Sequence, residues 1–287
     1  LGVLRARALG GRSTQGLAMH RFFIAPEWLK GDRVTIGGSL VHQIRNVLRL
    51  GPGDRIVVLD NSGWEREVEI ARVERQRVTG RVVDKRLATG EPRTKITLYQ
   101  GVLRLRRFEF ALQKGTELGI VEFVPLITDR CIISSVEDVD KKMERWRRIV
   151  VEAAEQARRG RLPRLQPAML LPQACERAKR MGGLSLMPWE GERSTSLRAV
   201  LGDWAPKELK RVRKQMGAQS SSTPPASSRP FSINLFIGPE GGFTPEEVEL
   251  ARRYGIIPVT LGPRILRAET AGLVAAAAIL YELGDLE

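Results

Sequence analysis

Two glycine-bearing loops, each directly after an apolar run, most constrain what this chain can fold into. The segment GPEGG at residues 238–242 follows an apolar run at 232–237, and LGPRILRAET at 261–270 follows one at 256–261. Apolar runs of this length predict buried strands, and glycine permits a sharp turn and a close approach of backbone to a ligand. Ligands of α/β sheets bind at loops that leave strand ends. The pattern therefore predicts an α/β domain with one site at both loops, although either loop alone could be an ordinary strand-to-helix turn.

Helix signals surround these loops. Thr244, Pro245 and Glu247 are typical of a helix start, with a capping threonine, a proline in the first turn and a glutamate that closes a capping box. This helix is expected to end near Tyr254, before Gly255. The last predicted helix, at residues 270–283, is apolar on nearly every face, which predicts burial on all sides.

The charge balance indicates a polyanionic partner. The 287 residues suffice for one large or two modest domains, and 47 Lys and Arg against 33 Asp and Glu give a net charge of +14. Such an excess suits RNA phosphates, although some basic proteins bind no polyanion. Two distant cysteines, Cys131 and Cys175, and two histidines predict neither a disulfide framework nor a metal site. No apolar run reaches the roughly 20 residues that cross a bilayer.

Together, IGPEGGFT at residues 237–244 and LGPRILRAETA at 261–271 resemble the signature of the SPOUT-superfamily methyltransferases, and in detail the ribosomal RNA small subunit methyltransferase E family. Neither loop matches a P-loop or the G-x-G-x-x-G dinucleotide fingerprint. The resemblance implies a parallel sheet with a C-terminal trefoil knot that holds S-adenosylmethionine, and no residue pattern by itself indicates the knot. It also implies methylation of N3 of a specific uridine near the 3′ end of 16S ribosomal RNA in the 30S subunit.

The cofactor site that the resemblance implies uses three loops, the first after a short strand at residues 184–187. Its backbone groups are expected to contact adenine and ribose. The expected cofactor-binding residues are Pro188, Glu190, Ile237, Gly238, Pro239, Glu240, Gly241, Gly242, Leu261, Gly262, Arg264, Ile265 and Leu266.

The N-terminal part, residues 19–91, predicts a small β-barrel because its strands are short and closely spaced. The expected strands are at residues 33–36, 55–59, 67–73 and 78–83, with a helix at 40–50. HQIRNVLRLGPGD at 42–54 resembles the PUA-like RNA-binding domain of the same family. RNA contacts are expected from Arg21, His42, Arg45 and Arg49. Alternatively, His42 packs or caps a helix and the arginines form a solvated face.

The leader, residues 1–18, contains three arginines and no acidic residue. Such a leader can be an organelle transit peptide. MHRFFI at 19–24 resembles the N-termini of the family, so we expect Met19 to be the initiator and residues 1–18 to be a disordered extension or an over-extended start. The expected location is the cytoplasm.

The second domain is expected at residues 92–287, entered through Glu91-Pro92-Arg93. A strand at 96–102, a helix at 106–118 and a strand at 121–127 predict a βαβ unit and hence a parallel sheet. A helix at 139–158 follows. The segment at about 215–230 has the Ser- and Pro-rich composition of a linker and predicts a disordered insertion.

Two segments of this domain resemble further family motifs. KGTELG at 114–119 resembles K-x-T-E-L-G, although Lys114 and Glu117 are also spaced for a surface salt bridge. EQARR at 155–159, with a proline at position 163, resembles E-Q-x-x-R…P. Ala157 and Arg158 depart from the small polar residue and the glycine that the family has at these positions, which puts a side-chain role at Ala157 in doubt.

The chemistry implied by the resemblance needs help at the target base. A neutral uracil N3 carries a proton and is a poor nucleophile, so a cation that stabilises the developing anion, or a base that takes the proton, would lower the barrier. Arg267 is the expected catalytic cation, with Arg159 second, and Glu155 and Glu269 are the candidate bases or organisers. Arg–Glu pairs that merely hold a loop are the alternative. Residues Lys114, Glu117, Gln156 and Glu269 are expected to contact RNA around the base.

The last predicted helix offers more apolar surface than one side of a sheet covers, and SPOUT enzymes pair through such helices, so a homodimer is expected. Two other functions stay open. The chain could be a SPOUT enzyme acting on transfer RNA, or a non-catalytic RNA-binding protein with the same two domains.

Overall fold

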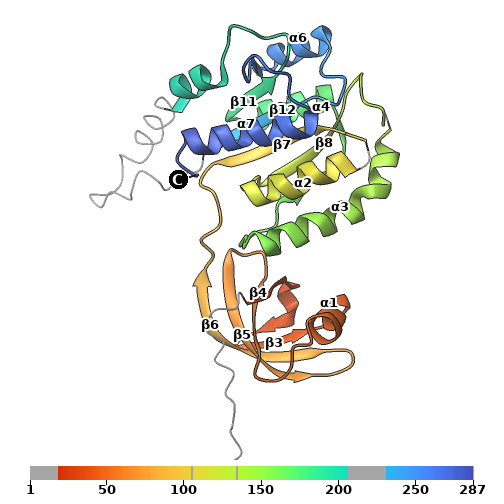
Figure 1. Ribbon diagram of the computed structural model, residues 1–287, viewed down its shortest axis with the longest axis vertical. Helices are drawn as coiled ribbons and strands as arrows, with labels where there is room; N and C mark the ends of the chain where they lie inside the picture. The colour runs from red at the N-terminus through yellow and green to blue at the C-terminus, as the bar shows by residue number, and fades with distance from the viewer. Residues whose placement is uncertain (1–18, 105, 134, 206–230, 287) are drawn as a thin grey trace, which may run out of the picture. The chain divides into compact units, whose positions relative to one another are not determined.

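The computed structural model describes residues 19–104, 106–133, 135–205 and 231–286. The predicted leader at 1–18 and the predicted insertion at about 215–230 both lie outside the described residues. The described chain forms two compact units (Figure 1). Of the described residues, one unit contains 19–58 and 65–85, and the other contains 59–64 and those between 86 and 286.

The boundary between the units differs from the predicted one at residues 91 and 92. The short segment 59–64 belongs to the second unit because its groups are hydrogen-bonded there. Asn61 Oδ1 accepts from the Leu162 N–H at 2.8 Å, and the Gly63 carbonyl accepts from the Ala88 N–H at 2.9 Å.

The first unit is a six-stranded sheet with the strand order β1-β4-β5-β6-β3-β2. Its elements are β1 (Arg21–Phe23), a 3₁₀ turn (Pro26–Trp28), β2 (Leu29–Lys30), β3 (Arg33–Ile36), α1 (Ser39–His42), a π-helical turn (Gln43–Val47), β4 (Arg55–Leu59), β5 (Trp64–Val73) and β6 (Val78–Leu87). Alternate residues of these strands, with Ile44 from the π-helical turn, form one apolar core, which is why the predicted alternating strands are found. The single helix predicted at 40–50 is replaced by α1 and the π-helical turn.

The second unit is a seven-stranded sheet with the order β10-β8-β7-β12-β11-β13, and β9 also pairs with β8. The strands are β7 (Lys95–Gly101), β8 (Glu122–Ile127), β9 (Arg164–Leu165), β10 (Met169–Leu170), β11 (Leu184–Pro188), β12 (Ser232–Ile237) and β13 (Ile257–Val259). The strands pair in parallel, with Lys95 opposite Ser232 and Thr97 opposite Glu122. The central strands are almost wholly buried, as their continuous apolar runs predict.

Helices cover both faces of this sheet (Figure 1). They are α2 (Arg106–Leu118), α3 (Val136–Gln156), α4 (Leu171–Met181), α6 (Pro245–Arg253) and α7 (Ala268–Glu282). Helix α2 packs against α3 and α7, and their core includes Phe108 against Trp146, with ring centroids 4.2 Å apart and the rings tilted by 32°. Helices α4 and α6 pack together over the other core, where Tyr99 and Phe236 stack at 4.3 Å.

Helix α7 is not buried on all sides as its composition predicts. Ala275, Ala276 and Ile279 are fully buried, but Val274 is 42% and Tyr281 is 73% exposed. The sheet and α2 cover one side of α7, and an apolar stripe on its other side remains open in the single chain.

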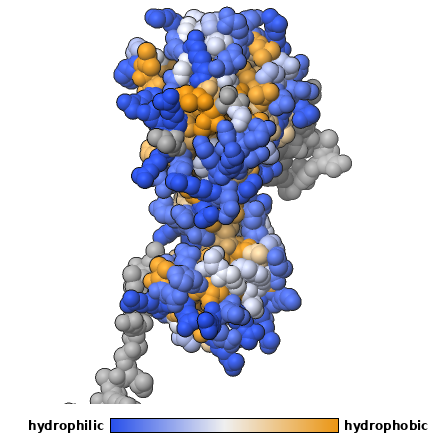
Figure 2. All heavy atoms as spheres, turned by 90° about the vertical axis from the view of Figure 1, so that its right-hand side faces the viewer, coloured by the Kyte–Doolittle hydropathy of each residue, from blue (hydrophilic) through white to orange (hydrophobic). Residues whose placement is uncertain are grey.

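The strand directions define two edges of the parallel sheet. The amino edge holds the starts of β7, β8, β11 and β12, and the carboxyl edge holds their ends. Six residues at about 3.3 Å each place the two edges roughly 20 Å apart. None of the helices that the structure describes is long and apolar enough to cross a membrane. On the face shown in Figure 2, hydrophilic residues cover most of the surface and apolar residues form separate areas.

Candidate functional site

Two adjoining cavities lie at the carboxyl edge of the second unit, between the loops that follow β11, β12 and β13. Their volumes are about 690 and 400 Å³. They share Pro188, Glu190, Ile265, Leu266 and Ala271 and so form one cleft, called here the carboxyl-edge cleft. Its lining combines apolar side chains such as Ile237 and Leu266 with the glycine-rich loop at 238–242, which suits a small organic ligand.

The loop after β12 owes its shape to three glycines. A Cβ on Gly101 would lie 2.6 Å from the carbonyl carbon of Gly238, so β7 can end beside this loop only without a side chain. Gly242 has a φ of 67° and approaches Glu190 so closely that its Cβ would lie 2.5 Å from Glu190 Oε1. The loop ends at Thr244, where the predicted capping box is confirmed by reciprocal bonds with Glu247 of 2.9 and 3.1 Å.

Charged groups from a different element hold this loop in place. Glu240 Oε1 accepts from the Arg104 N–H at 3.0 Å and from Arg107 Nη1 at 3.4 Å. Arg107 Nε lies 3.8 Å from Glu269 Oε1, so the arginine lies between two carboxylates. Arg130 Nη1 donates to the Gly241 carbonyl at 2.8 Å.

Glu269 carries an unusual oxygen. Its side chain is 13% exposed, and its Oε2 is buried without a hydrogen-bond partner among the described residues. Buried carboxylate oxygens are nearly always hydrogen-bonded, so an orphaned one in the wall of a cleft indicates a donor that a ligand supplies.

The loop after β13 leads into α7 and positions Arg267. Arg267 is the residue before the helix, and its carbonyl accepts from the N–H groups of Thr270 and Ala271 at 2.9 and 2.8 Å. The Arg267 side chain is exposed, lines the cleft and makes no ion pair with a described residue. Its guanidinium is therefore available to a ligand.

The loop after β11 is ordered by Glu192. Its Oε1 accepts from Ser194 Oγ at 2.7 Å and from the N–H groups of Ser194 and Thr195, and these bonds lower the pKa of Glu192 to about 2. Arg252 of α6 also donates to Glu192, at 3.3 Å. The carboxylate stays charged over the whole physiological range and fixes one wall of the cleft.

All thirteen residues predicted to bind the cofactor line this one cleft. Those from the first and third loops are Pro188, Glu190, Leu261, Gly262, Arg264, Ile265 and Leu266, and those from the second are Ile237, Gly238, Pro239, Glu240, Gly241 and Gly242. The sequence did not single out Arg107. It lies 81 residues or more before the other residues of the cleft and matches no motif, and only the pairing of β7 with β12 brings it there.

The second predicted catalytic cation, Arg159, is not in the cleft. It is 2% exposed and lies at the amino edge, where it donates to Glu91 at 2.9 Å and to the carbonyls of Thr116 and Ile120 at 2.9 and 3.1 Å. Within one chain it cannot reach a base held at the carboxyl edge. The prediction of Arg159 as a catalytic cation is corrected accordingly for the single chain: it is a buried structural cation.

The other motif residues lie near Arg159 rather than near Arg267. Glu155 and Gln156 form the end of α3, four and three residues before Arg159, and Lys114 Nζ pairs with Glu117 Oε1 at 2.8 Å on α2. The expectation that these residues and Arg267 surround one base is therefore wrong within a single chain. Arg158 has a φ of 57°, which explains why glycine suits this position.

The predicted RNA-binding residues of the first unit divide into two kinds. His42, Arg45 and Arg49 are exposed on α1 and the turn after it. Arg21 instead pairs with Glu65, and its side chain is only 11% exposed. Its predicted role as a phosphate contact is corrected for this reason.

Comparisons with known proteins agree with the two units. Residues 90–280 match the model of an RNA methyltransferase domain, and residues 36–83 match that of an RNA methyltransferase PUA domain. The ribosomal RNA small subunit methyltransferase E of Bacillus subtilis is 31% identical over 92% of this chain and 97% of its own length. Its counterpart from Synechocystis is 33% identical over 93% of this chain and 79% of its own length.

Solved structures extend the likeness to three dimensions. A ribosomal RNA small subunit methyltransferase E from Neisseria gonorrhoeae bound to S-adenosyl methionine superposes with a TM-score of 0.74, at 28% identity, over 92% of this chain and 98% of that one. A methyltransferase from Legionella pneumophila, in complex with the same cofactor, gives a TM-score of 0.74 over the same shares.

Proposed function

This chain belongs to the ribosomal RNA small subunit methyltransferase E family, and from that premise we propose that it transfers a methyl group from S-adenosylmethionine to N3 of a uridine in 16S ribosomal RNA. The observation that carries the proposal is the carboxyl-edge cleft, in which three loops meet Arg267 and Glu269, whose Oε2 has no hydrogen-bond partner among the described residues. Relatives of the same fold that hold this cofactor support it.

The lining of the cleft fits the cofactor. The contact of Gly101 with Gly238 and the positive φ of Gly242 shape the loop that lines the cleft, and Glu190 places a carboxylate beside it. When bound, S-adenosylmethionine supplies an activated methyl group on a sulfonium. The loop residues bind and orient it, which is the main requirement of an in-line displacement.

Two side chains act on the uracil. Glu269 Oε2, which is buried and has no hydrogen-bond partner in the described part of the chain, accepts the N3–H and takes the proton, so that N3 gains the electron density it needs as a nucleophile. Arg267 stabilises the negative charge that develops on the uracil ring. Of the two carboxylates predicted as bases, Glu269 is the one in the cleft, whereas Glu155 lies at the end of α3 near the amino edge.

The first unit contributes affinity rather than chemistry. His42, Arg45 and Arg49 are exposed and suited to phosphate contacts, which position RNA without reading its sequence. The substrate would be found on 30S subunits, which implies a cytoplasmic location.

The function can be tested with 30S subunits purified from a strain that lacks this gene. The protein and S-adenosylmethionine labelled on the methyl group are added, and the RNA is digested and analysed by mass spectrometry. We expect one 3-methyluridine in 16S ribosomal RNA, absent from the untreated subunits. Label on transfer RNA instead would favour a different SPOUT substrate, and no label on any RNA despite RNA binding would favour a non-catalytic RNA-binding protein.

We also propose that the chain forms a homodimer through α7. Val274, Ala278 and Tyr281 form an exposed stripe at helical spacing, and Ile265 beside the cleft is 88% exposed. Light scattering at micromolar concentration should report twice the chain mass of 32.0 kDa. Val274→Arg with Tyr281→Arg should give a monomer, whereas Glu144→Arg, at an exposed position of α3, should not. A wild-type monomer would reject the dimer.

A further inference from the structure

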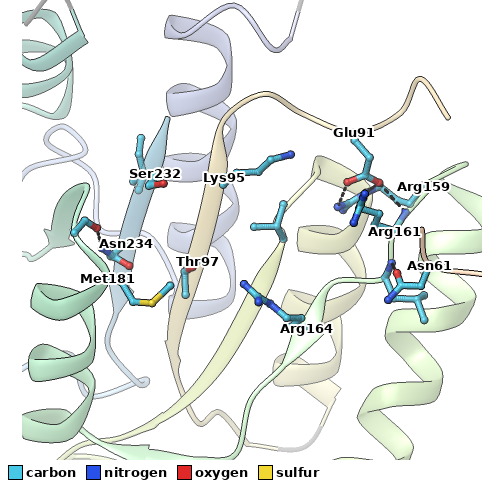
Figure 3. A pocket seen from close by; sticks show the side chains of 14 residues that line it. Asn61, Glu91, Lys95, Thr97, Arg159, Arg161, Arg164, Met181, Ser232 and Asn234 are labelled. Carbon is cyan, nitrogen blue, oxygen red and sulfur yellow. Dashed lines mark hydrogen bonds and ion pairs between the residues drawn. The ribbon is translucent and has the colours of Figure 1, made fainter. Parts of the chain in front are cut away.

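A second cavity of about 440 Å³ lies at the amino edge of the sheet, on the side opposite the carboxyl-edge cleft. All of its lining belongs to the second unit. In Figure 3, Glu91, Arg159, Arg161 and Asn61 lie on one side of this amino-edge cavity, and Met181, Ser232 and Asn234 lie on the other. Lys95, Thr97 and Arg164 lie between the two groups.

The cavity is rich in positive charge. Four cationic side chains and one carboxylate line it. The carboxylate, Glu91, is fully used: Oε1 accepts from Arg159 Nε at 2.9 Å and from the N–H groups of Gly160 and Arg161 at 3.0 and 3.1 Å, while Oε2 accepts from Arg159 Nη2 at 3.0 Å. The negative charge of Glu91 therefore balances the positive charge of the buried Arg159. The lining contains three other cations.

Those three cations are Lys95, Arg161 and Arg164. Arg164 Nε lies 3.2 Å from Glu122, but Glu122 already pairs with Arg177 at 2.9 Å, and the Arg164 side chain is 67% exposed. Arg161 Nη2 donates to the Ser62 carbonyl at 2.7 Å, a neutral partner that leaves its charge unbalanced.

The pKa of Lys95 is affected by the excess of positive charge in the cavity. Its Nζ donates to the Pro92 carbonyl at 2.5 Å, which uses one of three donors. Burial lowers the pKa of Lys95, and the nearby Arg159 and Arg161 lower it further, whereas Glu91 and Asp285 oppose the change. A partly buried ammonium beside two guanidinium groups is a position that an anion stabilises.

We propose that the amino-edge cavity binds the phosphate group of a nucleotide between Lys95, Arg161 and Arg164. Three cations in the lining of one cavity suit an anion with several oxygens, and guanidinium groups match phosphate geometry. The opposite side of the cavity carries hydroxyl, amide and thioether groups from Ser232, Asn234 and Met181, which suit a sugar and a base. A volume of about 440 Å³ accommodates one nucleotide unit.

The phosphate has two sources, a free nucleotide or one residue of an RNA chain. The test uses the full-length protein with two probes, uridine 5′-monophosphate and a labelled single-stranded RNA of about ten nucleotides. Binding of each probe is measured for the wild type, Lys95→Met, Lys95→Arg and Arg164→Gln. Lys141→Met is the matched control, since Lys141 is 74% exposed on α3 and makes only a surface pair with Asp138. Melting temperatures and S-adenosylmethionine binding are measured on the same samples.

Loss of a charged hydrogen bond to phosphate should weaken binding about tenfold or more in Lys95→Met and Arg164→Gln. Lys95→Arg should retain most of the affinity because it keeps the charge, and Lys141→Met should behave as wild type. Weakened binding of the mononucleotide alone assigns the cavity to a free nucleotide, and weakened binding of RNA assigns it to the RNA chain. If neither probe binds the two variants more weakly than wild type, the proposal is wrong. Because S-adenosylmethionine binding should be unchanged throughout, this result is independent of methyl transfer.

Discussion

Gly101, at the end of β7, packs against Gly238 so closely that a Cβ on Gly101 would lie 2.6 Å from the Gly238 carbonyl carbon. The two residues are far apart in the sequence, and their contact fixes the loop that forms one wall of the carboxyl-edge cleft. Gly101→Ala should therefore displace this loop and weaken S-adenosylmethionine binding at least tenfold, as measured by calorimetry. Gly202→Ala is the control, since Gly202 lies in a helical segment with open space around its Cβ position. Equal affinities of both variants would show that the loop tolerates the displacement.

Arg267→Ala should slow the methyl-transfer step by roughly 10²-fold or more, because removal of one group that stabilises developing charge has this effect. Cofactor and RNA should still bind. Arg264→Ala provides the comparison, since Arg264 lines the cofactor side of the same loop and should change cofactor affinity more than rate. Single-turnover kinetics on 30S subunits separate an effect on the methyl-transfer rate from an effect on cofactor affinity. A full rate in Arg267→Ala would leave Arg267 as a loop-holding residue.

Glu269→Gln should reduce the rate about 10²- to 10⁴-fold, as expected for loss of a general base, and should leave cofactor binding intact. The glutamine keeps the shape of the side chain but takes up no proton. Substrate RNA that contains 5-fluorouridine has a more acidic N3–H and should recover part of the lost rate. A defect of the same size on both substrates would indicate that Glu269 positions Arg107 rather than takes the proton.

Arg45→Ala combined with Arg49→Ala should weaken RNA binding and reduce the slope of log affinity against log salt by about 2, since two phosphate contacts are lost. The binding of S-adenosylmethionine should not change. Arg148→Ala with Lys141→Ala removes two exposed charges of α3 and serves as the control. An unchanged salt slope would place the phosphate contacts elsewhere.

Glu122→Gln should lower the free energy of unfolding by about 3–5 kcal/mol at neutral pH, because Arg177 would lose its partner in a buried network. Burial alone would raise the pKa of Glu122, but hydrogen bonds from Arg177 and Gln166 outweigh it and the pKa lies below its ordinary value of 4.5. The advantage of the wild type should therefore be complete above pH 4.5 and disappear as the pH falls through the lowered pKa.

Denaturant unfolding at several pH values measures this difference. Glu144→Gln, at a surface pair with Arg148, should change stability by less than about 0.5 kcal/mol. A constant difference between wild type and Glu122→Gln down to pH 2 would contradict the assignment.

The elements of this protein follow closely from local sequence. Some features depend only on neighbouring residues in the chain: the apolar runs of β12 and β7, the capping box at Thr244 and the helix end at Gly255. The hydrophobic pattern and the turn residues therefore suffice to predict them. The loops that line the carboxyl-edge cleft also belong to short contiguous segments after predicted strands, whereas the resemblance to the family implied which thirteen of their residues bind the cofactor.

Which residues from distant segments meet in one site cannot be predicted from local sequence. Arg159 and Arg267 both belong to family motifs, yet the parallel sheet places Arg159 at its amino edge and Arg267 at its carboxyl edge. Arg107 reaches the cleft only because β7 pairs with β12. Likewise, the apolar composition of α7 indicated burial but not its exposed stripe. The sequence alone determined which segments form strands, helices and turns, since those depend on local interactions. Strand order alone decided which side chains meet, because that order depends on the packing of the whole domain.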